Sequence, residues 1–119
     1  MAKVLLAEDD PTMVSLLQTL LKMEGFETVA LERDADVVEA VLREKPDILF
    51  MDVHLGHQSG MEAVESIRNN SQIADVRVVM TSGMNVKDEC LRRGADSFLL
   101  KPFMPADLIG VLKRNNHLA

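Results

Sequence analysis

Five short apolar runs alternate with segments of helical pattern along this chain. The runs cover residues 4–7, 26–31, 48–51, 76–80 and 97–100. Each run is bounded by polar residues, which is typical of strands buried on both faces of a parallel sheet. Strands that alternate with helices predict successive βα units around one sheet. With 119 residues, the chain has the length of a single domain that can bury a normal core.

The segments between the runs carry the start and stop signals of helices. Asp10 and Pro11 supply an N-cap and a first helical residue after the first run, and Gly25 ends that helix. Either Asp34 or Asp36 is suited to cap the second helix. Helical patterns also follow the three later runs, so the sequence predicts a helix after every strand.

Charged residues follow three of the runs at their carboxyl ends. Glu8, Asp9 and Asp10 follow the first run, Asp52 follows the third, and Lys101 follows the fifth. Ligands of open parallel sheets bind outside the carboxyl ends of the strands, so these charges are expected at one edge. Grouped carboxylates hold a hard cation, an isolated aspartate accepts a phosphoryl group, and a lysine neutralises the added charge. The sequence therefore predicts a phosphoryl-transfer site.

This arrangement resembles the receiver domain of two-component response regulators, including the chemotaxis receivers, over almost the whole chain. The residues that match the family motif are Glu8, Asp9, Asp52, Gly60, Thr81, Lys101 and Pro102. The resemblance implies a flavodoxin-like α/β fold with a doubly wound, five-stranded parallel sheet of strand order 2-1-3-4-5 and five flanking helices. It also implies one receiver domain over residues 1–119.

The resemblance also implies a role for each residue of the expected site. Asp52 corresponds to the phosphoacceptor, and Lys101 corresponds to the cation that pairs with the phosphoryl group. The Thr81 hydroxyl is expected to bond a phosphoryl oxygen, while Phe98 turns inward, so Thr81 and Phe98 would form the switch. The Lys101-Pro102 peptide bond is expected to be cis, as it is in the family.

A divalent cation is the expected cofactor of this site. Crowded carboxylates raise each other's pKa unless a cation relieves the repulsion, and Mg²⁺ prefers oxygen ligands. Glu8, Asp9 and Asp52 are the expected carboxylate ligands, and Asp10 is a poorer candidate because it caps a helix. The resemblance adds the backbone carbonyl of His54. The histidines of this segment lack partners spaced for a transition metal, which argues against zinc.

The chain departs from the family pattern at three positions. Gly56 stands where proline is common, and Ser59 stands where an acidic residue is frequent. Both differences suggest a more mobile loop after Asp52. Ser82 replaces a smaller residue and is expected to narrow access to the phosphoryl group slightly.

The expected function is a phosphorylation-activated signalling switch in a two-component phosphorelay. A sensor histidine kinase or histidine phosphotransfer protein would donate the phosphoryl group to Asp52 in a Mg²⁺-dependent reaction. The fourth helix, fifth strand and fifth helix would then change their surface, through which the family pattern also allows a homodimer. Apart from self-catalysed phosphotransfer and autodephosphorylation, the chain is not expected to be an enzyme.

Three other functions fit parts of the pattern. A haloacid-dehalogenase-like phosphatase carries its nucleophile after the first strand, with a second aspartate two residues on, where this chain has His54. A flavodoxin would place its flavin phosphate against Glu8 and Asp9, which would repel it. A pseudo-receiver would only dock partners, and the complete set of site residues argues against that role.

The composition of the chain argues against nucleic acid and membranes as partners and indicates a cellular compartment. A net charge of −6 and a pI near 5.0 argue against direct binding to nucleic acid. No apolar run approaches the roughly 20 residues that span a bilayer. The single cysteine suits a reducing compartment, and the first run begins too early to leave room for a signal peptide. These features predict a cytoplasmic protein without a membrane anchor.

Overall fold

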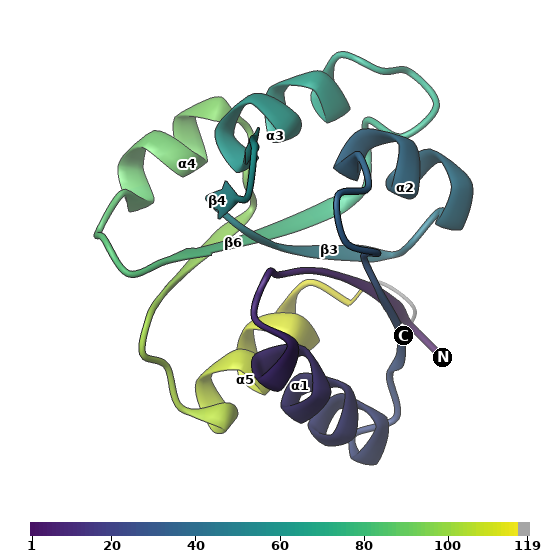
Figure 1. Cartoon of the computed structure of the whole chain (residues 1–119), viewed down its shortest axis with the longest axis vertical. Helices are drawn as coiled ribbons and strands as arrows, with labels where there is room; N and C mark the ends of the chain where they lie inside the picture. Colours follow the sequence, from purple (N-terminus) through teal and green to yellow (C-terminus); the bar gives the residue numbers. More distant parts are fainter. Residues whose placement is uncertain (117–119) are drawn as a thin grey trace.

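The computed structural model describes residues 1–116, and a five-stranded parallel sheet lies at its centre (Figure 1). Its strands are β1 (Lys3–Ala7), β2 (Glu27–Ala30), β3 (Ile48–Asp52), β6 (Arg77–Ser82) and β7 (Ser97–Leu100). They lie in the order β2-β1-β3-β6-β7, and every neighbouring pair is parallel. Counted along the chain, these five strands have the predicted order 2-1-3-4-5.

Helices cover both faces of the sheet. The helices of the described residues are α1 (Pro11–Met23), α2 (Val37–Glu44), α3 (Gly60–Arg68), α4 (Lys87–Arg93) and α5 (Pro105–Arg114). Figure 1 places α1 and α5 on one side of the sheet and α2, α3 and α4 on the other. This arrangement confirms the predicted doubly wound, flavodoxin-like α/β fold. None of the described helices is long and apolar enough to cross a membrane.

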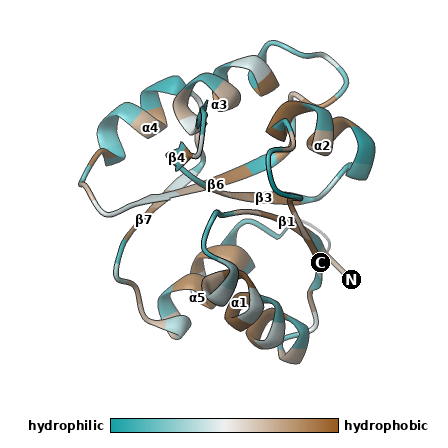
Figure 2. Ribbon diagram, viewed as in Figure 1, coloured by the Kyte–Doolittle hydropathy of each residue, from teal (hydrophilic) through white to brown (hydrophobic). Residues whose placement is uncertain are grey.

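The strands are buried on both faces because neighbouring residues point to opposite sides of the sheet. Val4 and Leu6 pack toward α1 and α5, whereas Leu5 and Ala7 pack toward α2 and α3, and all four are almost completely buried. Figure 2 shows the resulting hydrophobic colour along the strands and on the helix faces that meet them. Continuous apolar runs, rather than alternating ones, are therefore required in these strands.

Aspartates cap the first two helices as the sequence predicted. Asp10 Oδ1 accepts hydrogen bonds from the backbone N–H groups of Thr12, at 3.0 Å, and Met13, at 3.4 Å. Of the two candidates for α2, Asp36 is the cap, because its Oδ1 accepts the Val38 N–H at 3.1 Å. These bonds satisfy N–H groups that the first turn of a helix leaves without intrahelical partners.

The segment after Asp52, expected as a mobile loop, contains a β-hairpin. Its strands, β4 (His54–Leu55) and β5 (Gln58–Ser59), pair antiparallel. A second difference concerns β6, which continues through Ser82, so Thr81 lies inside the strand and does not follow it. Thr81 pairs with Asp52 in the register of β3 and β6, which extends the ladder beyond the apolar run.

Arg68, at the end of α3, fastens three segments together in a way that the sequence did not indicate. Its guanidinium donates hydrogen bonds to the backbone carbonyls of Ala74 and Gly94 and forms an ion pair with Asp96, at 2.8 Å. The backbone N–H of Val78 donates to the same carboxylate. This half-buried network joins the end of α3 to the starts of β6 and β7.

Candidate functional site

Three charged side chains meet at the carboxyl ends of β1, β3 and β7. Lys101 Nζ lies 2.5 Å from Asp52 Oδ2 and 3.0 Å from Glu8 Oε2. Only 13% of the Asp52 side chain and 5% of the Glu8 side chain are exposed, compared with 25% for Lys101. The structure therefore brings together residues from three parts of the chain, as the sequence predicted for the carboxyl edge of the sheet.

Both carboxylate oxygens of Asp52 have hydrogen-bond donors. Asp52 Oδ1 accepts the backbone N–H of His54 at 2.9 Å, while Oδ2 accepts from Lys101. Asp52 is the last residue of β3, so its backbone is held by the sheet and its side chain leaves at the edge. A carboxylate held in this way is oriented for attack on an incoming group.

Burial and charge act in opposite directions on the two residues that pair with Asp52. Burial raises the pKa of Glu8 above its usual value of 4.5, assisted by the Asp52 charge, and Lys101 only partly offsets this rise. Burial lowers the pKa of Lys101, but its hydrogen bonds to Asp52 and Glu8 outweigh burial and raise it above 10.5. Lys101 is therefore charged at neutral pH and joins two carboxylates that repel each other.

The raised pKa of Glu8 predicts that a Glu8→Gln variant is more stable than the wild type. A folded state with a raised carboxyl pKa binds the proton more tightly than the unfolded state, so ionised Glu8 opposes folding as pH rises above 4.5. We expect a gain of about 1 kcal/mol at pH 7 without metal, the scale of stabilising substitutions at functional sites. The gain should disappear in thermal melts below pH 4.5; an equal gain at all pH values would contradict the assignment.

Asp9 and Asp10 have separate environments. Asp9 is exposed, and its Oδ2 accepts the backbone N–H of Gly56, in the β4–β5 hairpin, at 2.7 Å. Asp10 is occupied as the cap of α1. Glu8 and Asp9, the acidic pair that was predicted to bind the metal, thus have different partners. Glu8 is directed to Lys101, and Asp9 is directed to the hairpin.

The donor set is suited to Mg²⁺ although it is not a preformed cage. Within residues 1–116, no three side chains of His, Cys, Asp or Glu come together as a group that could hold a metal ion. Mg²⁺ needs no such group, because it is commonly bound through one or two carboxylates and retains several waters. Oxygen donors are available from Glu8, Asp9 and Asp52 at the carboxyl edge of the sheet. The backbone of the exposed His54 lies at the same edge. These residues fit a hydrated, oxygen-preferring ion.

The two expected switch residues lie on β6, which pairs with the strand of Asp52, and on β7, which pairs with β6. Thr81 is fully buried, and its hydroxyl donates to the backbone carbonyl of Leu99 at 2.6 Å, so it is directed to β7 and not to Asp52. Phe98 is half-buried and packs against the core on the side of α2, α3 and α4. The Lys101-Pro102 bond is cis, as expected from the resemblance. Ser82 is buried, and its hydroxyl accepts the Met84 N–H.

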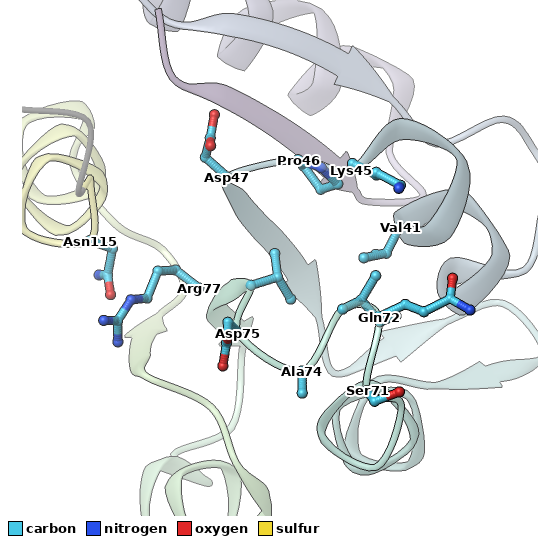
Figure 3. A pocket seen from close by; sticks show the side chains of 12 residues that line it. Val41, Lys45, Pro46, Asp47, Ser71, Gln72, Ala74, Asp75, Arg77 and Asn115 are labelled. Carbon is cyan, nitrogen blue, oxygen red and sulfur yellow. The ribbon is translucent and has the colours of Figure 1, made fainter.

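Among the cavities of residues 1–116, two lie at opposite ends of the strands. A cavity of about 1060 Å³ adjoins Glu8 and Asp9 and extends to Gln58, between the hairpin, α1 and the loop before α2. Figure 3 shows a smaller cavity of about 300 Å³, where Asp47 and Arg77 mark the amino ends of β3 and β6. Of these two cavities, the larger one adjoins the acidic residues Glu8 and Asp9.

Gln58 is the residue beside the site that the sequence did not single out. Its side chain joins the hairpin to the start of α2, through partners at Ala35 and Val37. The Gly56-His57 pair is a weak hairpin signal, because glycine is favoured at the first central position of one class of two-residue turn. Nothing in the local sequence indicates the partners of Gln58, which come from another element.

Comparison with known proteins identifies the family. A family model described as the response regulator receiver domain matches residues 4–113. The chain is 32% identical over 113 residues to the transcriptional regulatory protein GltR of Pseudomonas aeruginosa, covering 92% of this chain and 47% of GltR. It is 34% identical over 123 residues to the sensor protein GacS of Pseudomonas syringae pv. syringae, covering 98% and 14%. The chain spans about half the length of GltR and a small part of GacS.

Solved structures agree with this result. The chemotaxis response regulator CheY4 of Vibrio cholerae is 29% identical, with a TM-score of 0.83 over 98% of this chain and 99% of CheY4. The receiver domain of the sensor histidine kinase PA1611 from P. aeruginosa PAO1 is 26% identical, with a TM-score of 0.83 over 95% of each chain, and holds a magnesium ion in its active-site cleft. With a family match that spans most of its length and a shared fold, the chain belongs to the response regulator receiver domain family, a family of signalling domains.

Proposed function

We propose that residues 1–119 are a receiver domain that works as a phosphorylation switch, in which Asp52 accepts a phosphoryl group from a phosphohistidine. The observation that carries this proposal is the contact of Lys101 with both Asp52 and Glu8 at the carboxyl edge of the sheet. It supports the proposal because a nucleophilic carboxylate, a second carboxylate and a lysine ammonium are groups that phosphoryl transfer to aspartate needs.

In the proposed reaction, a carboxylate oxygen of Asp52 attacks phosphorus and the bond from phosphorus to the histidine nitrogen breaks. The imidazole retains the electron pair of that bond, and Asp52 becomes an acyl phosphate. Lys101 then forms an ion pair with the phosphoryl oxygens and neutralises part of their negative charge. Water later attacks the same phosphorus, the bond from phosphorus to the Asp52 oxygen breaks, and inorganic phosphate leaves as the Asp52 carboxylate is regenerated. This step accounts for autodephosphorylation without a separate enzyme activity.

Mg²⁺ is the proposed cofactor, held by Glu8, Asp9, Asp52 and the backbone carbonyl of His54. When bound, it supplies positive charge to the phosphoryl oxygens as their negative charge develops. Support comes from the oxygen-rich donor set and from the magnesium ion in the cleft of the PA1611 receiver domain. The chain's own residues orient the nucleophile, because the His54 N–H and Lys101 hold the two oxygens of Asp52.

The proposed switch begins at Thr81 and ends at a surface. A phosphoryl oxygen would compete with the Leu99 carbonyl for the Thr81 hydroxyl, and Phe98 would move with it. The surface of α4, β7 and α5 would respond. Exposed apolar side chains around it, including Met84, Leu91 and Leu100, support its use as a contact face, including between two copies of this chain.

The proposed phosphoryl donor is a sensor histidine kinase or a histidine phosphotransfer protein, and the proposed location is the cytoplasm. Similarity to GacS, a sensor protein, and to the receiver domain of the sensor histidine kinase PA1611 supports the donor. The net charge of −6 argues against nucleic acid as a direct partner of these residues.

Incubation with acetyl phosphate tests the proposal without a kinase. Intact mass should increase by one phosphoryl group in the presence of Mg²⁺, because the metal neutralises charge during transfer. The increase should be lost with EDTA and after hydroxylamine treatment, which cleaves acyl phosphates. Equal labelling with and without Mg²⁺ would contradict the role given to the metal, and absence of labelling in both would contradict the proposed function.

Asp9 and Asp10 should contribute unequally to Mg²⁺ affinity. Asp9→Asn removes a carboxylate from the edge of the site, whereas Asp10→Asn changes a helix cap that asparagine can also provide. We expect Asp9→Asn to weaken Mg²⁺ binding about tenfold or more and Asp10→Asn to have a smaller effect, measured by calorimetric titration. Equal losses in both variants would show that the acidic pair has been misassigned.

A further inference from the structure

The β4–β5 hairpin places a backbone donor beside the acidic pair. Its two-residue turn is Gly56-His57, and Gly56 has φ +55°, which suits the first central position of a type II′ turn. The Gly56 N–H donates to Asp9 Oδ2 at 2.7 Å. Leu55 anchors the hairpin, because it is only 3% exposed and belongs to the core on the side of α2 and α3.

Gln58 fastens the other strand of the hairpin to the start of α2. Its Nε2 donates to the Ala35 carbonyl at 2.6 Å, and its Oε1 accepts the Val37 N–H at 2.9 Å. Val37 is the first residue of α2, so this N–H has no partner within the helix. Both polar groups of one half-buried side chain are thus used to hold two loops together.

We propose that Gln58 is a positioning residue for the metal site. It fixes the hairpin against the start of α2 and thereby keeps the Gly56 N–H on the Asp9 carboxylate, which orients Asp9 for a divalent cation. This inference rests on the proposed function, since it assigns Asp9 to the metal. It adds a path from the metal site to α2, separate from the path through Thr81.

The expected loss of Mg²⁺ affinity depends on how many contacts separate Gln58 from the metal ligand Asp9. Groups that hydrogen-bond directly to a metal ligand typically change metal affinity about 10–100-fold when removed. Gln58 acts through the Gly56 backbone, one step further out, so we expect a loss of about 3–10-fold. Coupling between two sites is reciprocal, so cation binding at Asp9 should also be sensed by the Val37 amide.

A Gln58→Met variant tests this inference, because methionine retains the length and flexibility of glutamine without its hydrogen bonds. Mg²⁺ titration followed by amide NMR should give a dissociation constant about 3–10-fold higher than in the wild type. In the wild type, the Val37 and Gly56 resonances should shift with the same midpoint, and in Gln58→Met the Val37 response should be lost. Gln72→Met, at an exposed glutamine of the α3–β6 loop, is the matched control and should bind like the wild type.

A Val37→Pro variant removes the same hydrogen bond from its other end. Proline suits the first position of a helix, and Asp36, at φ −74° and ψ 126°, has the extended backbone that a residue before proline requires. The variant should weaken Mg²⁺ binding as Gln58→Met does, and the double variant should lose little more than either single one. Thermal melts distinguish this loss from unfolding, because Val37 is also a core residue.

The outcomes separate this inference from the proposed function. A folded Gln58→Met variant with wild-type Mg²⁺ affinity and an unchanged Val37 response would overturn the role of Gln58 and leave the proposed function intact. Additive losses in the double variant would also overturn it, because the two changes would then act on different contacts. Absence of Mg²⁺ binding by the wild type would overturn both.

Discussion

An Asp52→Asn variant is expected to gain no phosphoryl group from acetyl phosphate and Mg²⁺. An amide oxygen is a poor nucleophile compared with a carboxylate oxygen, and its attack would not give a stable acyl phosphate. The fold should persist, because asparagine has nearly the same shape and Lys101 keeps its contact with Glu8. Intact mass spectrometry of equal amounts of both proteins measures the difference, which should be complete.

Asp75→Asn is the matched control for this experiment. Asp75 is an exposed aspartate at the other end of the strands, where it lines the smaller cavity (Figure 3). Its replacement changes the net charge by the same amount and should leave labelling unchanged. Undiminished labelling of Asp52→Asn would exclude Asp52 as the phosphoacceptor, and loss in both variants would indicate an effect of charge alone.

The second large effect is expected for Gly60→Ala, at the first residue of α3. A Cβ at this position would lie 2.6 Å from the Asp52 backbone oxygen and 3.0 Å from Met80 Cε and Val53 Cα. The nearest atom belongs to the backbone, so the chain next to Asp52 must shift. We expect a loss of about 2–3 kcal/mol in the free energy of unfolding, measured by urea denaturation, and slower labelling of Asp52.

Gly83→Ala provides the comparison for Gly60→Ala. An added Cβ at Gly83 meets nothing within 4 Å, and this glycine does not have a positive φ. Its replacement should change stability by less than about 0.5 kcal/mol. If both variants were equally stable, the close approach of α3 to the end of β3 would not be the reason for glycine at position 60.

The architecture was predictable because it rests on continuous apolar runs. Strands that are buried on both faces need apolar residues at every position, and the polar residues that follow them lie at the sheet edge. This logic located Glu8, Asp52 and Lys101. In the structure, Lys101 lies within hydrogen-bond distance of both Glu8 and Asp52. It was less successful at the end of β6, where Thr81 and Ser82 continue the strand as buried polar residues.

The hairpin and its contacts were not predictable in the same way. Strands of two residues are too short to display a period, and Gly56 and Ser59 suggested a mobile loop. The partners of Gln58 lie 21 and 23 positions away in the sequence, so they depend on how α2 packs beside β3. Arg68 is a similar case, since its ion-pair partner Asp96 lies 28 positions away in the sequence. Hydrogen bonds between side chains of one segment and the backbone of another leave no periodic pattern.

Locating the phosphoryl group is the most direct test of the central claim that Asp52 is the phosphoacceptor. Borohydride reduces an aspartyl phosphate to homoserine, and peptide mass spectrometry then identifies the residue that has changed. After labelling with acetyl phosphate and Mg²⁺, we expect homoserine in place of Asp52 and unchanged Glu8 and Asp9. Reduction at Glu8 or Asp9 with Asp52 intact, or a phosphoryl group on His54 or His57 that borohydride does not remove, would contradict the account.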